Sequence, residues 1–137
     1  MVNNTRSSIL GVLYESRGVD HEDNRRALLT AFNGDLGSFV ATQVKFAVMK
    51  QDAVLGGHYH TYDELFYLLE GQGTFSLRDT RSEVSGQNVE YQLVKGDRLF
   101  IPPYVAHKAL VKAGSILVGC TAEPYVSPAH NDKKFDF

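Results

Sequence analysis

Short strand-like segments separated by turn residues run along most of this chain, and this pattern constrains its fold more than any other feature. The clearest apolar segments lie at 64–70, 91–94, 98–101 and 115–121. Glycine, proline and asparagine separate them, and no segment of useful length has a helical period. Many short strands with such punctuation are typical of an all-β sandwich or barrel. The sequence therefore predicts an all-β fold.

The first half of the chain carries a weaker version of the pattern. Residues 27–32 are predicted to form a short strand after a solvated, charged loop at 21–26. In residues 37–50, Val40, Val44, Phe46 and Val48 share one parity and Gln43 and Lys45 the other. Such alternation predicts a strand whose apolar side is buried. The tail at 123–137 reads as a loop, which aromatic residues would hold against the body.

Length and composition limit the classes of function. The chain has 137 residues, a formal net charge of −2 and one cysteine. This length predicts one domain over residues 1–137, and the charge gives no general attraction to nucleic acid or anionic membranes. A single cysteine excludes an internal disulfide framework, and Cys120 lies in an apolar strand pattern typical of a core residue. The N-terminal segment has neither a signal-peptide pattern nor a membrane span, so we expect a cytoplasmic protein.

Chemistry concentrates in one stretch, residues 57–71. His58 and His60 are two apart, so in an extended strand both imidazoles point to the same face. Glu64 shares their parity and joins them if the backbone stays extended, while the glycines at 56 and 57 allow a sharp bend before them. Two imidazoles and a carboxylate can hold zinc, iron, manganese or nickel. A fourth ligand and a pocket remain to be found.

Two stretches together resemble the two motifs of the cupin superfamily. The first motif is matched by His58, His60, Glu64 and Gly71, and the second by Gly96, Pro102 and His107. Asp52, Tyr104 and Val111 stand where the motifs usually have Gly, Gly and Asn. The resemblance spans about residues 37–121.

This resemblance implies a fold, a metal site and an assembly. Cupins are antiparallel jelly-roll β-barrels that often form homodimers and hold a metal inside the barrel mouth. Position by position, His58, His60, Glu64 and His107 are implied as the four ligands of a divalent ion. The partner expected in the barrel is a small molecule.

Other interpretations of the same residues stay open. The histidines and Glu64 could form a satisfied polar cluster in a barrel without metal, or Glu64 could be an unliganded general base. Phe66 and Leu68 share the parity of Glu64 and are expected to wall the pocket. Tyr104 is a candidate proton donor at the mouth, with packing at the rim as its alternative.

Three functions remain open, because a cupin fold does not specify a reaction. Residues 57–60, 64–73 and 101–111 are similar to segments of metal-dependent cupin-type phosphoglucose isomerases, which favours a sugar isomerase or epimerase. Nucleotide-sugar ketoisomerases and epimerases share the Gly-His-any-His segment but act without metal, and Glu64 argues for a metal. A metal-dependent dioxygenase is the second interpretation, and a binding or sensing module that is not an enzyme is the third.

Overall fold

The structure, a computed structural model, describes residues 9–81 and 87–137 and consists almost entirely of antiparallel β-strands. Its elements are β1 (Leu13–Ser16), β2 (His21–Glu22), β3 (Ala27–Leu28), β4 (Gln43–Val48), β5 (Ala53–Tyr59), β6 (Glu64–Glu70), β7 (Gln72–Asp79), β8 (Val89–Val94), β9 (Asp97–Ile101), β10 (Val105–Val111), β11 (Ile116–Thr121), α1 (Pro128–Asn131) and β12 (Lys133–Lys134). No helix in these two ranges is long and apolar enough to cross a membrane.

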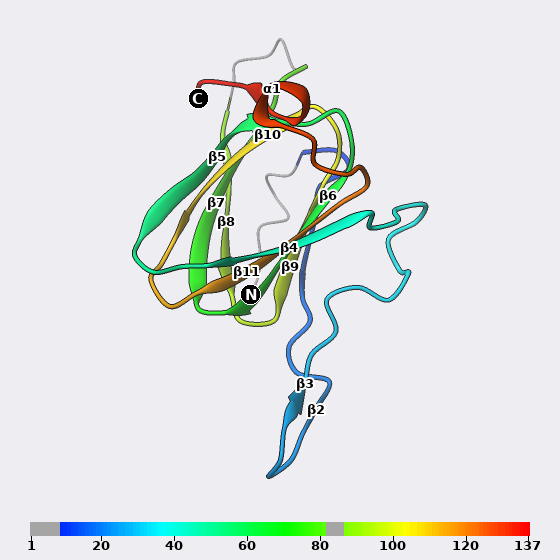
Figure 1. Cartoon of the computed structure of the whole chain (residues 1–137), viewed down its shortest axis with the longest axis vertical. Coiled ribbons are helices and arrows are strands. Elements are labelled where there is room, and N and C mark those ends of the chain that lie inside the picture. Colours follow the sequence, from blue (N-terminus) through cyan, green and yellow to red (C-terminus); the bar gives the residue numbers. More distant parts are fainter. Residues whose placement is uncertain (1–8, 82–86) are drawn as a thin grey trace.

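Two five-stranded sheets form the body of the molecule. The first has the order β1-β9-β6-β11-β4 and the second the order β12-β5-β10-β7-β8. Apart from the pair β7–β8, strands that are neighbours in these sheets are not consecutive in the chain, and every pair is antiparallel. The two sheets curve toward each other, with α1 at one end of the barrel (Figure 1). The prediction of an all-β jelly-roll barrel is confirmed.

Apolar side chains fill two separate regions. Between the sheets lies a core that includes Leu68, Phe75, Leu93 and Leu99, all at most 1% exposed. A second cluster covers the outer face of the first sheet: Leu65, Tyr67, Val118 and Cys120 pack there against the segment that runs from Leu29 to Ala41. The assignment of Cys120 to the core is therefore confirmed, and its burial raises the pKa of its thiol.

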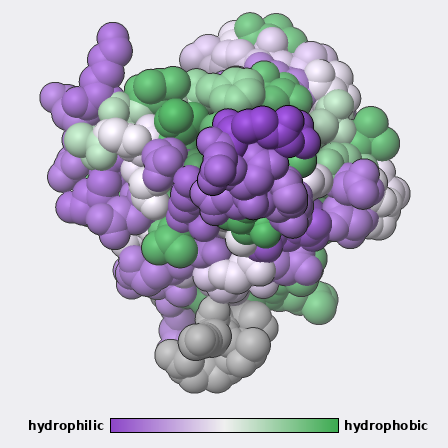
Figure 2. Space-filling view, turned by 90° about the horizontal axis from the view of Figure 1, so that it is seen from below, coloured by the Kyte–Doolittle hydropathy of each residue, from purple (hydrophilic) through white to green (hydrophobic). Residues whose placement is uncertain are grey.

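The segment before β4 differs from the sequence prediction. Only Ala27 and Leu28 form a strand, β3, and this strand pairs with β2 in a small hairpin where a loop was predicted. The rest of the predicted 27–32 strand leaves the hairpin and packs its apolar side chains on the first sheet instead. The hairpin extends away from the barrel (Figure 1). Seen from the side of the hairpin, the centre of the molecular surface is mostly hydrophilic (Figure 2).

The direction in which β4 faces also differs from the prediction. The alternation is present, but Val44, Phe46 and Val48 are 53%, 59% and 64% exposed. The polar parity, Gln43 and Lys45, lines the cavity between the sheets instead. β4 is the last strand of its sheet, and its inner side faces a cavity rather than the packed core, so polar side chains can be accommodated there. The apolar side chains of β4 are thus more than half exposed among the described residues.

Candidate functional site

The candidate residues come from three strands that meet at one end of the barrel. His58 lies on β5, and His107 is its direct partner on the neighbouring strand β10. His60 follows the end of β5, and Glu64 is the first residue of β6 in the opposite sheet. The structure therefore brings both sequence motifs to the same place, with His58 and His107 on neighbouring strands of one sheet and Glu64 on the other sheet.

A β-bulge in β5 directs His58 into the barrel. Across the β5–β10 pair, His58 faces His107 but Gly56 faces Lys108, so Gly57 is an extra residue in β5. Gly56 and Gly57 both have φ near +90°, a region that glycine adopts readily. A Cβ on Gly56 would lie 2.6 Å from the carbonyl oxygen of His107. The two glycines thus allow the close approach that sets the two imidazoles side by side.

The three imidazoles converge on one point. One ring nitrogen from each of His58, His60 and His107 lies within 4.8 Å of the other two. The ring centroids are 4.7 Å apart for His58 and His60 and 4.8 Å apart for His58 and His107. Such spacing is that of ligands able to share one metal ion.

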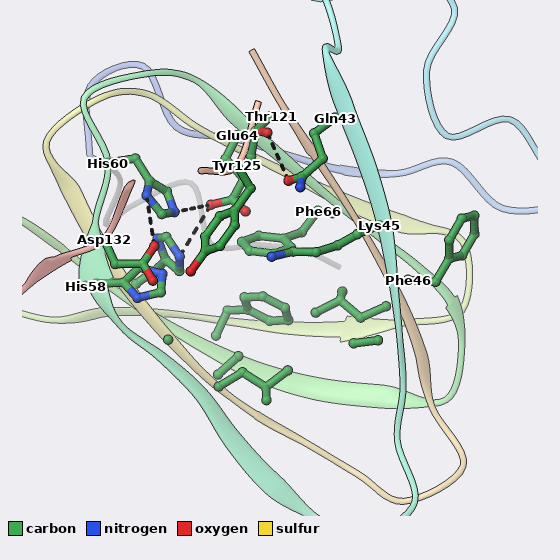
Figure 3. Close-up of a pocket in the computed structure, with 18 of the residues that line it drawn as sticks. Gln43, Lys45, Phe46, His58, His60, Glu64, Phe66, Thr121, Tyr125 and Asp132 are labelled. Atoms are coloured by element: carbon green, nitrogen blue, oxygen red, sulfur yellow. Dashed lines mark hydrogen bonds and ion pairs between the residues drawn. The ribbon is translucent and has the colours of Figure 1, made fainter. Parts of the chain in front are cut away.

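The Glu64 carboxylate faces two of these rings (Figure 3). Its Oε1 atom lies 3.1 Å from Nε2 of His60 and 3.4 Å from Nε2 of His107. Oε1 is nonetheless buried without a well-aligned hydrogen bond among the described residues. An unpaired buried carboxylate oxygen is costly. A divalent ion bound by these atoms would satisfy it, so the residues present fit such an ion.

The electrostatics of the cluster differ from ring to ring. Burial lowers the pKa of His107 to about 4, and burial together with the charge of His60 lowers the pKa of His58. Burial opposes protonation of His60 as well, but its contact with Glu64 outweighs this and raises the pKa of His60. The Glu64 pKa is lowered: burial opposes ionisation, but the neighbouring His107 and His60 outweigh it. Metal binding requires neutral imidazoles and an ionised carboxylate. The pKa shifts of His58, His107 and Glu64 favour these states, whereas His60 must give up its extra proton to bind an ion.

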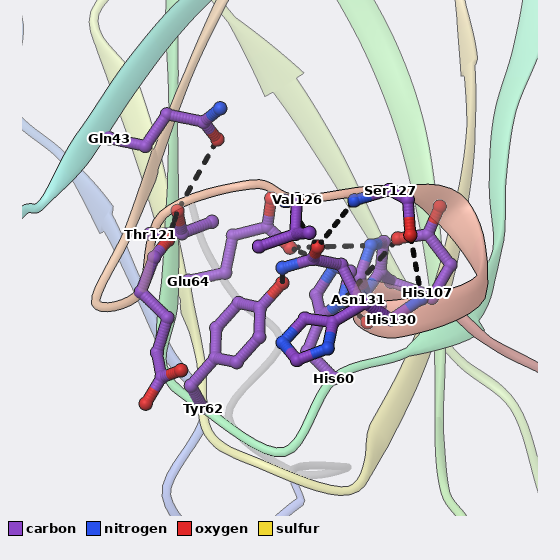
Figure 4. A network of polar contacts seen from close by, with 12 residues as sticks. Gln43, His60, Tyr62, Glu64, His107, Thr121, Val126, Ser127, His130 and Asn131 are labelled. Atoms are coloured by element: carbon purple, nitrogen blue, oxygen red, sulfur yellow. Dashed lines mark hydrogen bonds and ion pairs between the residues drawn. The ribbon is translucent and has the colours of Figure 1, made fainter.

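The C-terminal tail supplies contacts that the sequence did not predict (Figure 4). Nδ1 of His60 lies 2.8 Å from the backbone oxygen of Asn131, the last residue of α1. Because a carbonyl can only accept, Nδ1 carries the proton, and Nε2 of a neutral ring keeps its lone pair. Asn131 is 2% exposed, and its amide donates to the Tyr62 hydroxyl and accepts from Val126 and Ser127.

Beside the cluster lies a cavity of about 360 Å³. Its polar lining includes Gln43, Lys45, Tyr62, Thr121, Tyr125 and Asp132. Its remaining walls are largely apolar, with Leu55, Phe66, Phe75, Ala109 and Leu117 among them. Phe66 thus walls the cavity as expected, whereas Leu68 lies in the adjacent core.

Tyr104 does not line this cavity. Its ring lies 5.9 Å from the ring of Tyr59, with the Arg81 guanidinium on it at 5.5 Å. The residue has φ of 69° and is 39% exposed. This position corresponds to packing at the rim.

Comparison with known proteins shows the family. Residues 45–115, just over half of the chain, match the cupin domain family. The chain belongs to this family. It is 32% identical over 82 residues to an uncharacterized protein of Methanocaldococcus jannaschii, covering 58% of this chain and 54% of that protein. It is 27% identical over 133 residues to acireductone dioxygenase of Ciona intestinalis, covering 89% of this chain and 64% of that protein. The chain thus spans less than two thirds of either relative.

Solved structures of similar fold include enzymes of sugar metabolism. The structure matches dTDP-4-dehydrorhamnose 3,5-epimerase from Sulfolobus tokodaii with a TM-score of 0.76 and 20% identity, over 90% of this chain and 77% of that one. It also matches a 3'-monoepimerase from Streptomyces bikiniensis in complex with dTDP-quinovose. The TM-score is 0.79 and the identity 21%, over 90% of this chain and 69% of that one. At this identity the likeness shows the fold alone.

Proposed function

We propose that this chain is a metal-dependent cupin enzyme in which His58, His60, Glu64 and His107 hold one divalent ion. The observation that carries the proposal is the convergence of three imidazoles beside a buried carboxylate oxygen without a hydrogen bond. Zinc, iron, manganese and nickel all accept such nitrogen and oxygen ligands. The histidine–carboxylate set alone does not choose among them.

The reaction that we propose is the isomerisation or epimerisation of a small sugar or sugar derivative. A bound ion would polarise a carbonyl or hydroxyl oxygen of the substrate. The chain itself must then move a proton between substrate atoms. Asp132 lines the cavity next to His60, with the two side chains 3.8 Å apart at Oδ1 and Nδ1. Its carboxylate is free of the proposed ligand set, so it can act as the base.

Other residues would hold the substrate and keep water away. The Tyr62 and Tyr125 rings and the Thr121 hydroxyl line the cavity. Phe66 and Phe75 form an apolar wall next to His107. The centroid of the Phe66 ring lies 5.4 Å from that of Phe75 and 5.4 Å from that of His107. The resemblance of residues 57–60 and 101–111 to cupin-type sugar isomerases supports this reaction, and the fold shared with sugar epimerases agrees with it.

Deuterium exchange provides the test of the reaction. Metal-loaded protein in D2O is incubated with a panel of aldoses, ketoses and their phosphates, and nuclear magnetic resonance follows exchange at the carbon next to the carbonyl. We expect exchange with one substrate group and its loss in Asp132→Asn, while Asp136→Asn in the same tail keeps the rate. Metal-loaded protein that exchanges no proton in any member of the panel would speak against isomerisation.

A second function is favoured by two observations. The wall of the cavity is largely apolar, and the match to acireductone dioxygenase covers 89% of this chain. Iron in the same ligand set would make a dioxygenase. An oxygen electrode distinguishes the two: iron-dependent oxygen uptake with a small organic substrate, without proton exchange, selects the dioxygenase over the isomerase.

A further inference from the structure

Lys45 is the one lysine or arginine among the described residues that line the cavity. It lies on β4, and its side chain extends into the cavity near Phe66 and Tyr125 (Figure 3). The Lys45 ammonium lies 4.9 Å from the centre of the Tyr125 ring. No carboxylate in residues 9–81 or 87–137 is within 4.0 Å of it.

The sheet register fixes where this ammonium can reach. Lys45, Gly119 and Phe66 form one row across β4, β11 and β6, and Gln43, Thr121 and Glu64 form the next row. With strands about 4.8 Å apart and alternate residues about 7 Å apart, the Cα atoms of Lys45 and Glu64 are separated by about 12 Å. Gly119 between them has no side chain, and the edge of the Phe66 ring lies 3.5 Å from where its Cβ would be. The cavity that Lys45 and the histidine cluster both line, about 360 Å³, has room for a ligand of a few carbon atoms.

The electrostatics agree with this placement. The acidic residues of the cavity, Glu64 and Asp132, both lie on the side of His60. A divalent ion bound by Glu64 and neutral imidazoles would still carry net positive charge. The side of the cavity that holds Lys45 is thus suited to an anion.

We propose that Lys45 recognises an acidic group, a carboxylate or a phosphate, on the small molecule whose other end lies at the His58, His60, Glu64 and His107 cluster. This inference rests on the proposed metal site and adds the substrate class to it. The ammonium supplies a charge-assisted hydrogen bond to the acidic group. The apolar walls of the cavity, between Lys45 and the histidine cluster, contact the carbon atoms that join the two ends of the ligand.

Three hydroxamates test the proposal, because each binds a metal ion through the same head. Butyrohydroxamate is neutral at its other end, succinic acid monohydroxamate carries a carboxylate there, and phosphonoacetohydroxamate carries a phosphonate. Calorimetry measures their dissociation constants on protein loaded with the ion found by elemental analysis. We expect one of the acidic probes to bind about tenfold more tightly than the neutral one. The tighter acidic probe identifies the group.

Variants of Lys45 complete the test. Lys45→Met should abolish the preference for the acidic probe and leave butyrohydroxamate binding unchanged, while Lys45→Arg should keep most of the preference. Lys50→Met, at an exposed lysine outside the cavity lining, is the matched control and should keep all of it. Equal binding of all three probes, or a preference that survives Lys45→Met, overturns the Lys45 inference and leaves the metal proposal standing. If no ion loads, or no hydroxamate binds the loaded protein, the metal proposal itself fails, and the inference fails with it.

Discussion

Asn131 illustrates how a residue outside both motifs can support the candidate site. Its backbone oxygen contacts Nδ1 of His60, and its side chain ties α1 to Tyr62 and to the backbone at 124–127. Because the side chain is buried, every one of these bonds replaces a lost bond to water. Asn131 is therefore a positioning residue for His60.

Asn131→Ala should lower both stability and metal affinity. The backbone amides of Val126 and Ser127 would lose their acceptor, at a cost of about 2 kcal/mol in the free energy of unfolding. Metal affinity should fall between about tenfold and a hundredfold, because the carbonyl that orients His60 would no longer be held. Urea denaturation and titration against a chelator measure the two effects.

The control for this variant is Asn88→Ala. Asn88 is exposed and accepts one hydrogen bond from Arg78. Its removal should change neither stability nor metal affinity appreciably. An Asn131→Ala protein that loses stability but keeps full metal affinity would reduce Asn131 to a structural role.

At the residue scale, the sequence predicted the histidines better than their surroundings. His58, His60 and Glu64 share a parity, and His107 came from the resemblance to cupins. The cavity residues Lys45 and Asp132 were not predicted as part of the site. Their placement depends on which side of β4 faces inward and where the tail lies, and both are set by contacts between distant segments.

The β5 bulge leads to a prediction at the element scale. In Gly56→Ala, the new methyl group would meet the His107 carbonyl oxygen at 2.6 Å, whereas nothing lies within 4 Å of a Cβ on Gly57. Both variants strain a backbone with φ near +90°, at a cost of about 1 kcal/mol. We expect Gly56→Ala to cost about 3 kcal/mol or more in the free energy of unfolding, because backbone must also move.

Denaturation of the two alanine variants side by side measures this difference, with Gly57→Ala as the matched control. Gly56→Ala should also weaken metal binding, because the displaced backbone belongs to His107. Equal stability losses in the two variants would contradict the close packing of β5 against β10.

β4 shows why an alternating pattern does not tell which side of a strand is buried. The alternation correctly predicted that Gln43 and Lys45 lie on one side of the strand and Val44, Phe46 and Val48 on the other. The usual rule then assigns the apolar set to the core. In this barrel the inner side of β4 faces a cavity rather than the packed core, and the apolar set faces outward. β7 follows the rule: Phe75 and Leu77 are buried, and Thr74 and Ser76 between them are more exposed.

Ion pairs around one buried arginine help to hold strand β1 in the first sheet. Arg98 on β9 is 2% exposed and donates to Glu15 at 2.7 Å and to both carboxylate oxygens of Asp35 at 3.1 and 3.0 Å. The Arg98 guanidinium holds the pKa of Asp35 well below its ordinary value. Asp35 thus connects the segment after β3 to the sheet.

This lowered pKa predicts a dependence of stability on pH. As the pH falls, Asp35 takes up a proton near pH 4 in the unfolded chain and only at lower pH in the folded protein. The contribution of its ion pair to the free energy of unfolding is therefore fully present above about pH 4 and is lost progressively below it. Urea denaturation of the wild type and Asp35→Asn should show a clear difference at pH 7 and a smaller one at pH 3. A difference that stays constant between the two pH values would contradict the ion pair.

At the scale of the whole molecule, we propose that the homodimer expected from the resemblance to cupins forms through β4, whose apolar side chains are more than half exposed. β4 ends its sheet, so one row of its backbone groups has no partner strand in the described ranges. Antiparallel pairing of two β4 strands about a two-fold axis would satisfy both rows and cover Val44, Phe46 and Val48. Sedimentation should give twice the 15.2 kDa mass of one chain.

Phe46→Lys should convert this dimer to monomers, because it places two like charges, one from each chain, in the proposed interface. Val94→Lys, at an exposed valine at the end of β8, is the matched control and should remain dimeric. A monomeric wild type, or a dimer that is indifferent to Phe46→Lys, would exclude this interface.

Metal content tests the central claim most directly. Elemental analysis of protein purified without chelator should find about one divalent ion per chain. Glu64→Gln should keep the fold by circular dichroism and lose affinity for the ion by about tenfold or more, whereas Glu70→Gln, exposed at the other end of β6, should bind as the wild type does. Protein without an ion, whose thermal unfolding does not respond to added zinc, iron, manganese or nickel, would contradict the account.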